Sequence, residues 1–198
     1  MKNSNSKLIA GMDEAGRGSW AGPLVIGCVI LKDKNISGIT DSKVLSIRKR
    51  EQLFDRIVAS AHDWSIGIAE AYEIDKYGLN TAYFLAVRRT LERLSIKPNS
   101  VLFDGRQIKE ITYPKINFEF IIGGDSKIKE ISAASIIAKV FRDYYILNYE
   151  DKYSHYGFKN HKGYGTKEHQ LALEKHGALA FHRFSYKPLN KYQKSVNN

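Results

Sequence analysis

Two apolar runs joined by a short glycine-rich link constrain the fold of this chain more than any other feature of its sequence. The runs cover residues 8–12 and 24–31, and the second is rich in β-branched side chains. Both compositions predict β-strands. The link, which contains Gly16 and Gly18, is too short to hold a crossover helix, so we expect the two strands to pair antiparallel.

Further along the chain, strand-like and helix-like patterns alternate. Strand patterns cover residues 64–69, 101–105 and 118–122, and helical spacing covers residues 46–61, 73–94, 132–149 and 167–176. Ser46 is the expected N-cap of the first helix, and residues 73–94 form one helix or two. Residues 155–166 are expected to form a loop, and the polar stretch from Lys187 onward is expected to be frayed. The alternation predicts an α/β domain with a mixed sheet flanked by helices.

A domain boundary is expected near residue 153. Residues 1–153 contain the alternating strands and helices and form the main domain, whereas residues 154–198 form a small C-terminal segment of helix and loop. A chain of 198 residues is long enough for one domain with such an appendage.

The charge balance indicates a polyanionic partner. The chain has 31 Lys and Arg against 21 Asp and Glu, a formal net charge of +10, and such an excess commonly serves nucleic-acid binding. Because the chain has a single cysteine, Cys28, it can form neither an internal disulfide nor a thiolate metal site. Cys28 lies in an apolar run, which predicts a buried residue. Because the sequence contains neither a signal peptide nor a membrane-spanning run, we expect a cytoplasmic protein without membrane association.

Three predicted strands stop at acidic residues. Asp13 and Glu14 follow the first run, Asp104 closes a later strand, and Asp125 follows the last one. Strand ends of an open α/β sheet gather at one edge, where converging carboxylates repel one another unless cations share them. Oxygen ligands without cysteine favour Mg²⁺ or Mn²⁺, and two such ions support in-line cleavage of a phosphodiester.

Two considerations limit what these acids establish by themselves. Neighbouring strand residues point to opposite faces, so Asp13 and Glu14 can share one site only if the strand is distorted, which Gly16 and Gly18 would make easy. An acid at a strand end can also be an ordinary turn or capping residue. The pattern alone leaves a metal site and simple strand termination both open.

Five motifs in chain order resemble those of ribonuclease HII, the type 2 ribonuclease H of bacteria. They are residues 13–18 with 21–23, 41–43 with 45–46, 104–105, 124–125 with 131–143, and 161–166 with 182–183. The resemblance extends from about residue 9 to residue 188, nearly the whole chain. The sequence departs from many relatives at Ser19 and Trp20, where a proline and an aliphatic residue are usual.

The resemblance implies a ribonuclease H-like fold and an endonuclease that hydrolyses the RNA strand of RNA–DNA hybrids. It also implies incision 5′ of single ribonucleotides embedded in duplex DNA, with Mn²⁺ or Mg²⁺ as cofactor and with 5′-phosphate and 3′-hydroxyl ends as products. The implied partners are RNA–DNA hybrids and ribonucleotide-containing DNA. We expect a monomer in which the C-terminal segment contributes to substrate binding.

By motif position, the resemblance assigns catalysis and metal binding to four carboxylates: Asp13, Glu14, Asp104 and Asp125. Asp143 competes with Asp125 for the fourth place. However, Asp143 lies four residues after Lys139 on a predicted helix and can simply pair with it. We favour Asp125, because it lies at a strand end.

Substrate binding is assigned by the same resemblance to Gly16, Arg17, Gly18, Ser42, Lys43, Lys162 and Tyr164. The glycine-rich loop would sense the ribose 2′-hydroxyl, the tyrosine would pack on the adjacent deoxyribose, and the serine and lysines would contact phosphates. A tight turn, an ordinary loop aromatic and solvated surface residues are the alternative interpretations. His161 and His182 are expected to hold the C-terminal segment, or to lie near phosphate, rather than to bind metal.

Two other functions compete with this hypothesis. A related nuclease, such as a type 3 ribonuclease H or a Holliday-junction resolvase, would use similar carboxylates. A type 3 enzyme carries an extra N-terminal domain, whereas only twelve residues precede Asp13 here. A non-catalytic hybrid-binding protein would need the basic charge and Tyr164 but no cluster of acids.

Overall fold

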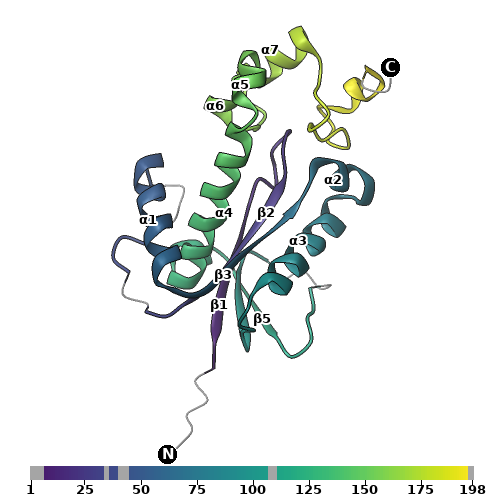
Figure 1. Cartoon of the computed structure of the whole chain (residues 1–198). Coiled ribbons are helices and arrows are strands. Elements are labelled where there is room, and N and C mark those ends of the chain that lie inside the picture. The colour runs from purple at the N-terminus through teal and green to yellow at the C-terminus, as the bar shows by residue number, and fades with distance from the viewer. Residues whose placement is uncertain (1–6, 34–35, 40–44, 107–110, 196–198) are drawn as a thin grey trace, which may run out of the picture.

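The computed structural model, which describes residues 7–33, 36–39, 45–106 and 111–195, contains a five-stranded sheet (Figure 1). Its strands are β1 (Ile9–Ala15), β2 (Leu24–Leu31), β3 (Ala61–Ala69), β4 (Ser100–Asp104) and β5 (Asn117–Ile121), in the order β3-β2-β1-β4-β5. β1 pairs antiparallel with β2, as predicted, and β2 pairs antiparallel with β3. β4 and β5 continue the sheet parallel to β1, which confirms the predicted mixed sheet.

Helices cover both faces of this sheet. One face carries α1 (Ile47–Ser60) and α4 (Lys129–Leu147), and the other carries α2 (Ala71–Tyr77) and α3 (Leu79–Arg93) (Figure 1). Beyond the end of α4 lie α5 (Glu150–Tyr153), α6 (Phe158–His161) and α7 (Lys167–His176). Short 3₁₀ helices are η1 (Gly124–Ser126), η2 (Ser154–Tyr156) and η3 (Asn190–Ser195). Within the described residues, none of the helices has both the length and the apolar content needed to cross a membrane.

Local signals explain where the predicted helices begin and end. The Ser46 hydroxyl accepts a hydrogen bond from the Lys49 N–H at 3.3 Å, which confirms the predicted N-cap of α1. Gly78, with φ of 79°, divides residues 73–94 into α2 and α3. The predicted helices over residues 132–149 and 167–176 correspond to α4 and α7.

Two predictions for the C-terminal segment are wrong. Residues 155–166 do not form a plain loop, because η2 and α6 lie largely within them. Gly157, in the left-handed region with φ of 73°, turns the chain between these two helical pieces. The stretch after Lys187 is not frayed at its start, because Leu189 is fully buried and η3 follows it.

The hydrophobic core has a layer on each face of the sheet. Met12 and Phe103 pack with residues of α3 such as Leu91, whereas Val29 packs with residues of α1 and α4. Cys28 is fully buried in the α3 layer, as predicted. Because strand residues alternate between the faces, both layers draw on the same strands.

α4 approaches the sheet so closely that two strand residues must be glycine. A Cβ added at Gly11 would lie 2.0 Å from the carbonyl carbon of Glu130, and one added at Gly27 would lie 2.5 Å from the carbonyl oxygen of Ala134. Both atoms belong to the backbone of α4, which cannot move aside as the end of a side chain can. Gly27 pairs with Asp13 across β1 and β2, so this contact seats α4 beside Asp13.

A separate hydrophobic cluster attaches the C-terminal segment to the rest of the chain. Ala21, which follows β1, and Ile146 of α4 pack there with Tyr156 and Phe158. An isolated bridge between Ala21 and His182 adds backbone pairing. The expected boundary near residue 153 stays a prediction.

Gly11→Ala should destabilise the fold by at least about 3 kcal/mol, because the added methyl group would collide with the α4 backbone. Urea unfolding followed by circular dichroism measures this loss. Gly18→Ala is the matched control for stability, since a Cβ at Gly18 would meet no atom within 4 Å. Equal losses in the two variants would contradict the close approach of α4.

Candidate active site

Three of the four predicted carboxylates meet at one edge of the sheet. Asp13 lies in β1, Asp104 is the last residue of β4, and Asp125 follows β5 in η1. Because these strands run parallel, their carboxyl ends share this edge. One oxygen from each carboxylate lies within 4.8 Å of those of the other two. Hard oxygen ligands at such spacing suit a divalent cation such as Mg²⁺ or Mn²⁺.

Asp13 is deeply buried within this cluster. It is only 5% exposed, and its carboxylate accepts hydrogen bonds from the Ser135 hydroxyl and, at 2.7 Å, from the Glu14 N–H. Burial raises the pKa of Asp13 from 3.8 to about 8, and the charges of Glu14 and Asp104 act in the same direction. A bound cation would favour the charged form and relieve this repulsion.

Asp104 and Asp125 are oriented by the connection between β5 and α4. The Gly124 N–H donates to Oδ1 of Asp104 at 2.7 Å, and the Ser132 hydroxyl donates to the main-chain oxygen of Asp125. Gly123 has a left-handed φ of 65° just before η1 and turns the chain there, so that Asp125 is buried. A short turn rather than a long helix therefore supplies the third carboxylate.

The Glu14 side chain lies outside this group of three. β1 pairs regularly through Asp13 and Glu14, opposite Gly27 and Ile26, so the two side chains point to opposite faces. On the α3 face, Oε2 of Glu14 accepts a hydrogen bond from the Tyr83 hydroxyl at 2.8 Å. Burial, followed by the charge of Glu14, raises the pKa of Tyr83 and keeps its hydroxyl protonated as a donor. A catalytic role for Glu14 stays a prediction.

One face of α4 connects the carboxylates to the predicted substrate-binding loop, a feature that the sequence reasoning missed. Ser132 and Ser135 contact two residues of the carboxylate cluster. Lys139 and Arg142 lie against the ring of Tyr164, with Nζ and Cζ at 5.4 and 5.1 Å from its centroid. Spacing of three or four residues places all four on one side of the helix. The available signal was polar residues at this spacing in a helix otherwise rich in Ala and Ile.

Asp143, the rival for the fourth carboxylate, is engaged elsewhere on α4. Its Oδ1 lies 2.8 Å from Nζ of Lys139, which confirms the predicted pairing four residues apart. Among the described residues, the carboxylates close enough to share an ion are Asp13, Asp104 and Asp125, and Asp143 is not one of them. The geometry thus supports Asp125 over Asp143.

The glycine-rich loop after β1 contains three predicted substrate-binding residues. Gly16 has a left-handed φ of 86°, and the backbone of Gly18 is open, since an added Cβ would meet no atom within 4 Å. Arg17 is exposed, with Nη1 3.9 Å from Oε1 of Glu14. Its carbonyl accepts a hydrogen bond from Nη1 of the buried Arg183 at 3.0 Å. The loop therefore has a fixed base and an accessible tip.

The other predicted contacts lie on the loop before α7 or outside the described residues. Tyr164 is half-buried, and Lys162 has a left-handed φ of 50°. Nζ of Lys162 donates to the carbonyl of Lys159 at 2.5 Å, and burial lowers the pKa of Lys162. Ser42 and Lys43 lie outside the described residues.

Two buried histidines fix the Tyr164 loop. Nδ1 of His169 lies 3.0 Å from the Tyr164 carbonyl, and Nε2 of His169 lies 3.0 Å from Nε2 of His182. The carbonyl can only accept, so neutral His169 carries its proton on Nδ1 and accepts from Nε2–H of His182. The Leu179 N–H completes this series of hydrogen bonds by donating to Nδ1 of His182 at 2.8 Å. His182 therefore holds the C-terminal segment, as expected.

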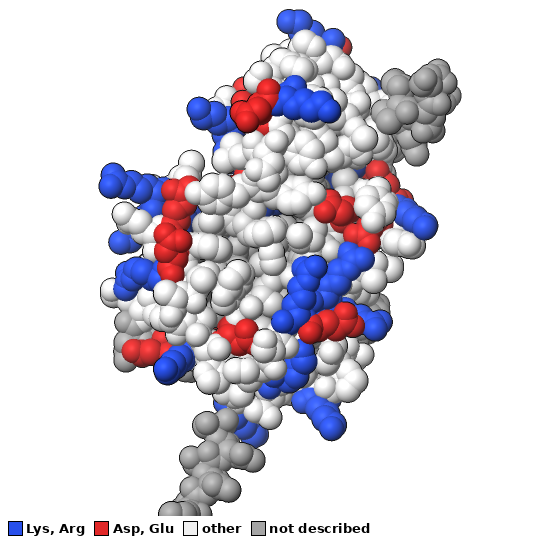
Figure 2. Space-filling view, in the orientation of Figure 1, with Lys and Arg blue, Asp and Glu red and all other residues white. Residues whose placement is uncertain are grey.

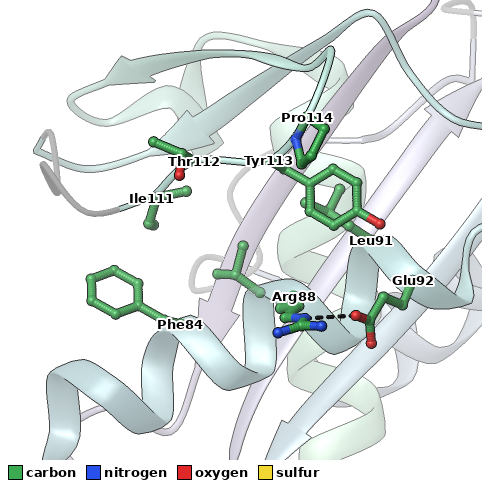
Figure 3. A pocket seen from close by; sticks show the side chains of 9 residues that line it. Phe84, Arg88, Leu91, Glu92, Ile111, Thr112, Tyr113 and Pro114 are labelled. Atoms are coloured by element: carbon green, nitrogen blue, oxygen red, sulfur yellow. Dashed lines mark hydrogen bonds and ion pairs between the residues drawn. The ribbon is translucent and has the colours of Figure 1, made fainter.

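A cavity of about 570 Å³ lies away from this cluster, between α3 and residues 111–114 (Figure 3). Phe84, Leu91 and Tyr113 line it, and an Arg88–Glu92 ion pair at 2.7 Å lies beside it. Among the described residues that line it, none is a predicted site residue. Figure 2 shows basic and acidic side chains interspersed over one face of the molecule, without a continuous basic patch on that face.

Comparisons with known proteins show the family and the fold of this chain. The family model described as Ribonuclease HII matches residues 10–189. A ribonuclease HII from Polaromonas sp. is 48% identical over 183 residues, which cover 92% of this chain and 90% of that protein. One from Coxiella burnetii is 42% identical over 191 residues, covering 96% and 93%. The crystal structure of ribonuclease H2 from Pyrococcus horikoshii matches with a TM-score of 0.78 at 28% identity, covering 96% of this chain and 99% of that one, which confirms the predicted ribonuclease H-like fold.

Asp13→Asn should weaken Mn²⁺ binding by at least about tenfold, because the ion loses one of its anionic oxygen ligands. The same change should raise the melting temperature of the metal-free protein by roughly 3 °C, since a buried carboxyl with a raised pKa is removed. Calorimetric titration and thermal unfolding measure the two effects. Asp143→Asn is the matched control and should bind Mn²⁺ like the wild type; an equal loss there would contradict the assignment.

Lowering the pH should destabilise the protein through His169 and His182. Burial lowers their pKa values from 6.5 to about 4 and about 3, so below pH 6.5 the unfolded chain binds more protons than the folded one. The histidine contribution to the free energy of unfolding should therefore fall with decreasing pH, by up to about 1.4 kcal/mol per pH unit for each histidine, while the raised pKa of Asp13 acts in the opposite direction and offsets about one of them. Urea unfolding at about pH 7 and about pH 5 tests this. His182→Gln should show a shallower dependence, and an unchanged slope would count against the histidines.

Proposed function

The chain belongs to the ribonuclease HII family and is therefore a hydrolytic endoribonuclease acting on RNA–DNA substrates, and from this premise we propose its finer specificity. The proposal is that it incises 5′ of single ribonucleotides in duplex DNA as well as within the RNA strand of hybrids, and leaves 5′-phosphate and 3′-hydroxyl ends. The observation that most supports a phosphodiesterase site is the meeting of Asp13, Asp104 and Asp125 within 4.8 Å.

The proposed mechanism requires divalent cations held by these carboxylates. Two Mg²⁺ or Mn²⁺ ions, when bound, would activate a water molecule and stabilise the departing 3′ oxygen. The chain's own contribution is to hold the ligands: Ser135 orients Asp13, and the Gly124 N–H occupies one oxygen of Asp104 and leaves the other for an ion. These fixed contacts reduce the reorganisation needed when an ion binds.

Glu14 takes a different part in this proposal. Its charge already acts on Asp13, but its carboxylate is hydrogen-bonded to Tyr83 on the other face of β1. To serve as a metal ligand, Glu14 would exchange this hydrogen bond for the ion. We propose that Asp13, Asp104 and Asp125 are the main metal ligands and that Glu14 is a fourth ligand, which contacts the ion only after its hydrogen bond to Tyr83 is broken.

Substrate recognition is proposed for the loops beside α4. The exposed tip of the Gly16–Arg17–Gly18 loop, at Arg17 and Gly18, would approach the ribose closely enough to detect its 2′-hydroxyl. Tyr164 would pack on the adjacent deoxyribose, and Lys162, Ser42 and Lys43 would contact phosphates. Tyr164 and Lys162 belong to the C-terminal segment, which would thus contribute to substrate binding. A monomer suffices, because these residues all come from one chain.

Cleavage of a labelled DNA duplex containing one ribonucleotide tests the proposal. With Mg²⁺ or Mn²⁺ we expect incision on the 5′ side of the ribonucleotide, and none with a chelator or with an all-DNA duplex. Asp104→Asn should reduce the rate by at least about 100-fold, because a metal ligand at the reacting phosphate is lost. Asp151→Asn, an exposed acid on α5, is the matched control. Cleavage of all-RNA hybrid alone would disprove the ribonucleotide specificity, and metal-independent cleavage would disprove the mechanism.

A further inference from the structure

Arg142 of α4 lies between the two loops to which ribose recognition is assigned. We propose that Arg142 and Ser19 are a positioning pair that holds the Gly16–Gly18 loop and Tyr164 in one fixed relation, and that this relation sets the preference for a single ribonucleotide. The inference rests on the proposed function, because it concerns how that specificity arises. Neither residue is assigned contact with substrate.

The first support is the set of hydrogen bonds made by the Arg142 guanidinium. Arg142 is fully buried; its Nε donates to the Pro23 carbonyl at 3.0 Å, and its Nη1 donates to the Lys162 carbonyl at 3.0 Å. Its Nη2 donates to the Ser19 hydroxyl at 2.7 Å and to the Ala21 carbonyl at 3.0 Å. One side chain thus joins the chain segment after β1 to the segment that carries Tyr164. The planar fork of arginine makes this possible, whereas a lysine has a single nitrogen.

The second support is the contact between Arg142 and the recognition loop itself. A Cβ added at Gly16 would lie 1.9 Å from Nε of Arg142, so the Gly16 backbone packs directly on the guanidinium. The buried Ser19 hydroxyl accepts from Arg142 and donates to the Gly16 carbonyl at 2.9 Å. Ser19 therefore links Arg142 to the Gly16–Gly18 loop through two hydrogen bonds.

The third support is the contact with Tyr164. Cζ of Arg142 lies 5.1 Å from the centroid of the Tyr164 ring, close enough for a cation–π interaction. Burial lowers the pKa of Arg142 to about 10, which leaves it charged at neutral pH. The same guanidinium therefore supports the ring that would contact deoxyribose and the loop that would contact ribose.

Trp20 strengthens the connection from the other side. The backbone N–H groups of Trp20 and Ala21 donate to the Gly163 carbonyl at 2.8 and 3.2 Å. A Cβ added at Gly165 would lie 2.1 Å from Cε2 of Trp20, so the indole packs on the Tyr164 loop. The Ser19–Trp20 pair thus lies where the two loops join.

Ser19→Ala tests the proposal with the smallest change. The readout is a ratio, in which kcat/KM on a DNA duplex with one ribonucleotide is divided by kcat/KM on an all-RNA hybrid. We expect the ratio to fall by about fivefold, because a hydrogen bond to a charged group is lost and the loop is released from Arg142. A purely structural role would lower both rates together and leave the ratio unchanged, and such a result would overturn the proposal.

Ser65→Ala is the matched control. Ser65 is also buried, and its hydroxyl donates to the Thr90 carbonyl at 2.8 Å, but it lies in β3 against α3. Its loss should lower the melting temperature while the ratio stays within about twofold of the wild-type value, since distant sites act independently. A ratio that falls as far in Ser65→Ala as in Ser19→Ala would overturn the proposal.

Tyr164→Ala, alone and combined with Ser19→Ala, tests whether the two residues act as a unit. If Ser19 acts by holding the loop relative to Tyr164, the double variant should lose little more of the ratio than Tyr164→Ala alone. If the double variant loses as much of the ratio as the two single variants combined, Ser19 and Tyr164 act independently and the proposed coupling is wrong. A wild-type protein that does not incise the single-ribonucleotide duplex would overturn the proposed function and this inference with it. A wild-type protein that cuts both substrates equally well would overturn this inference alone. A wild-type preference that survives Ser19→Ala would overturn the positioning role alone.

Discussion

The contact between the α4 backbone and the central strands is the constraint on which the rest of the structure depends. Gly11 and Gly27 allow α4 to lie directly against β1 and β2, with no side chain between them. This contact brings the hydroxyl of Ser135 to the carboxylate of Asp13, which is buried at the same place. With ordinary side chains between helix and sheet, α4 would stand too far away to supply that hydrogen bond.

α4 also fixes the distance between the carboxylate cluster and the two loops to which substrate recognition is assigned. Ser132 near its start contacts Asp125, and Arg142 ten residues later contacts the loops at the other end, a span of about 15 Å at the usual helical rise. A helix is a rigid spacer over that length, so movement of one region relative to the other is restricted. A duplex bound across this surface would meet the acids and the sugar-contacting loops at a defined separation.

Many elements could be predicted from local patterns, and the errors have identifiable causes. The N-cap at Ser46 and the antiparallel pairing of β1 with β2 depend on neighbouring residues, and both are confirmed. The loop predicted over residues 155–166 is wrong, because its aromatic residues find partners in a cluster that includes Ile146 and is built from distant segments. Local composition contains no information about such partners.

The sequence by itself determined the alternation of strands and helices, the acids at three strand ends and the resemblance to ribonuclease HII, because these depend on spacing and residue type along the chain. Only the tertiary structure decided that Asp13, Asp104 and Asp125 meet while Glu14 turns toward Tyr83. It also decided that Arg142 joins two loops far apart in sequence. The physical reason is that the direction of a side chain follows from strand pairing and from which helix covers each face, and both are set by long-range packing.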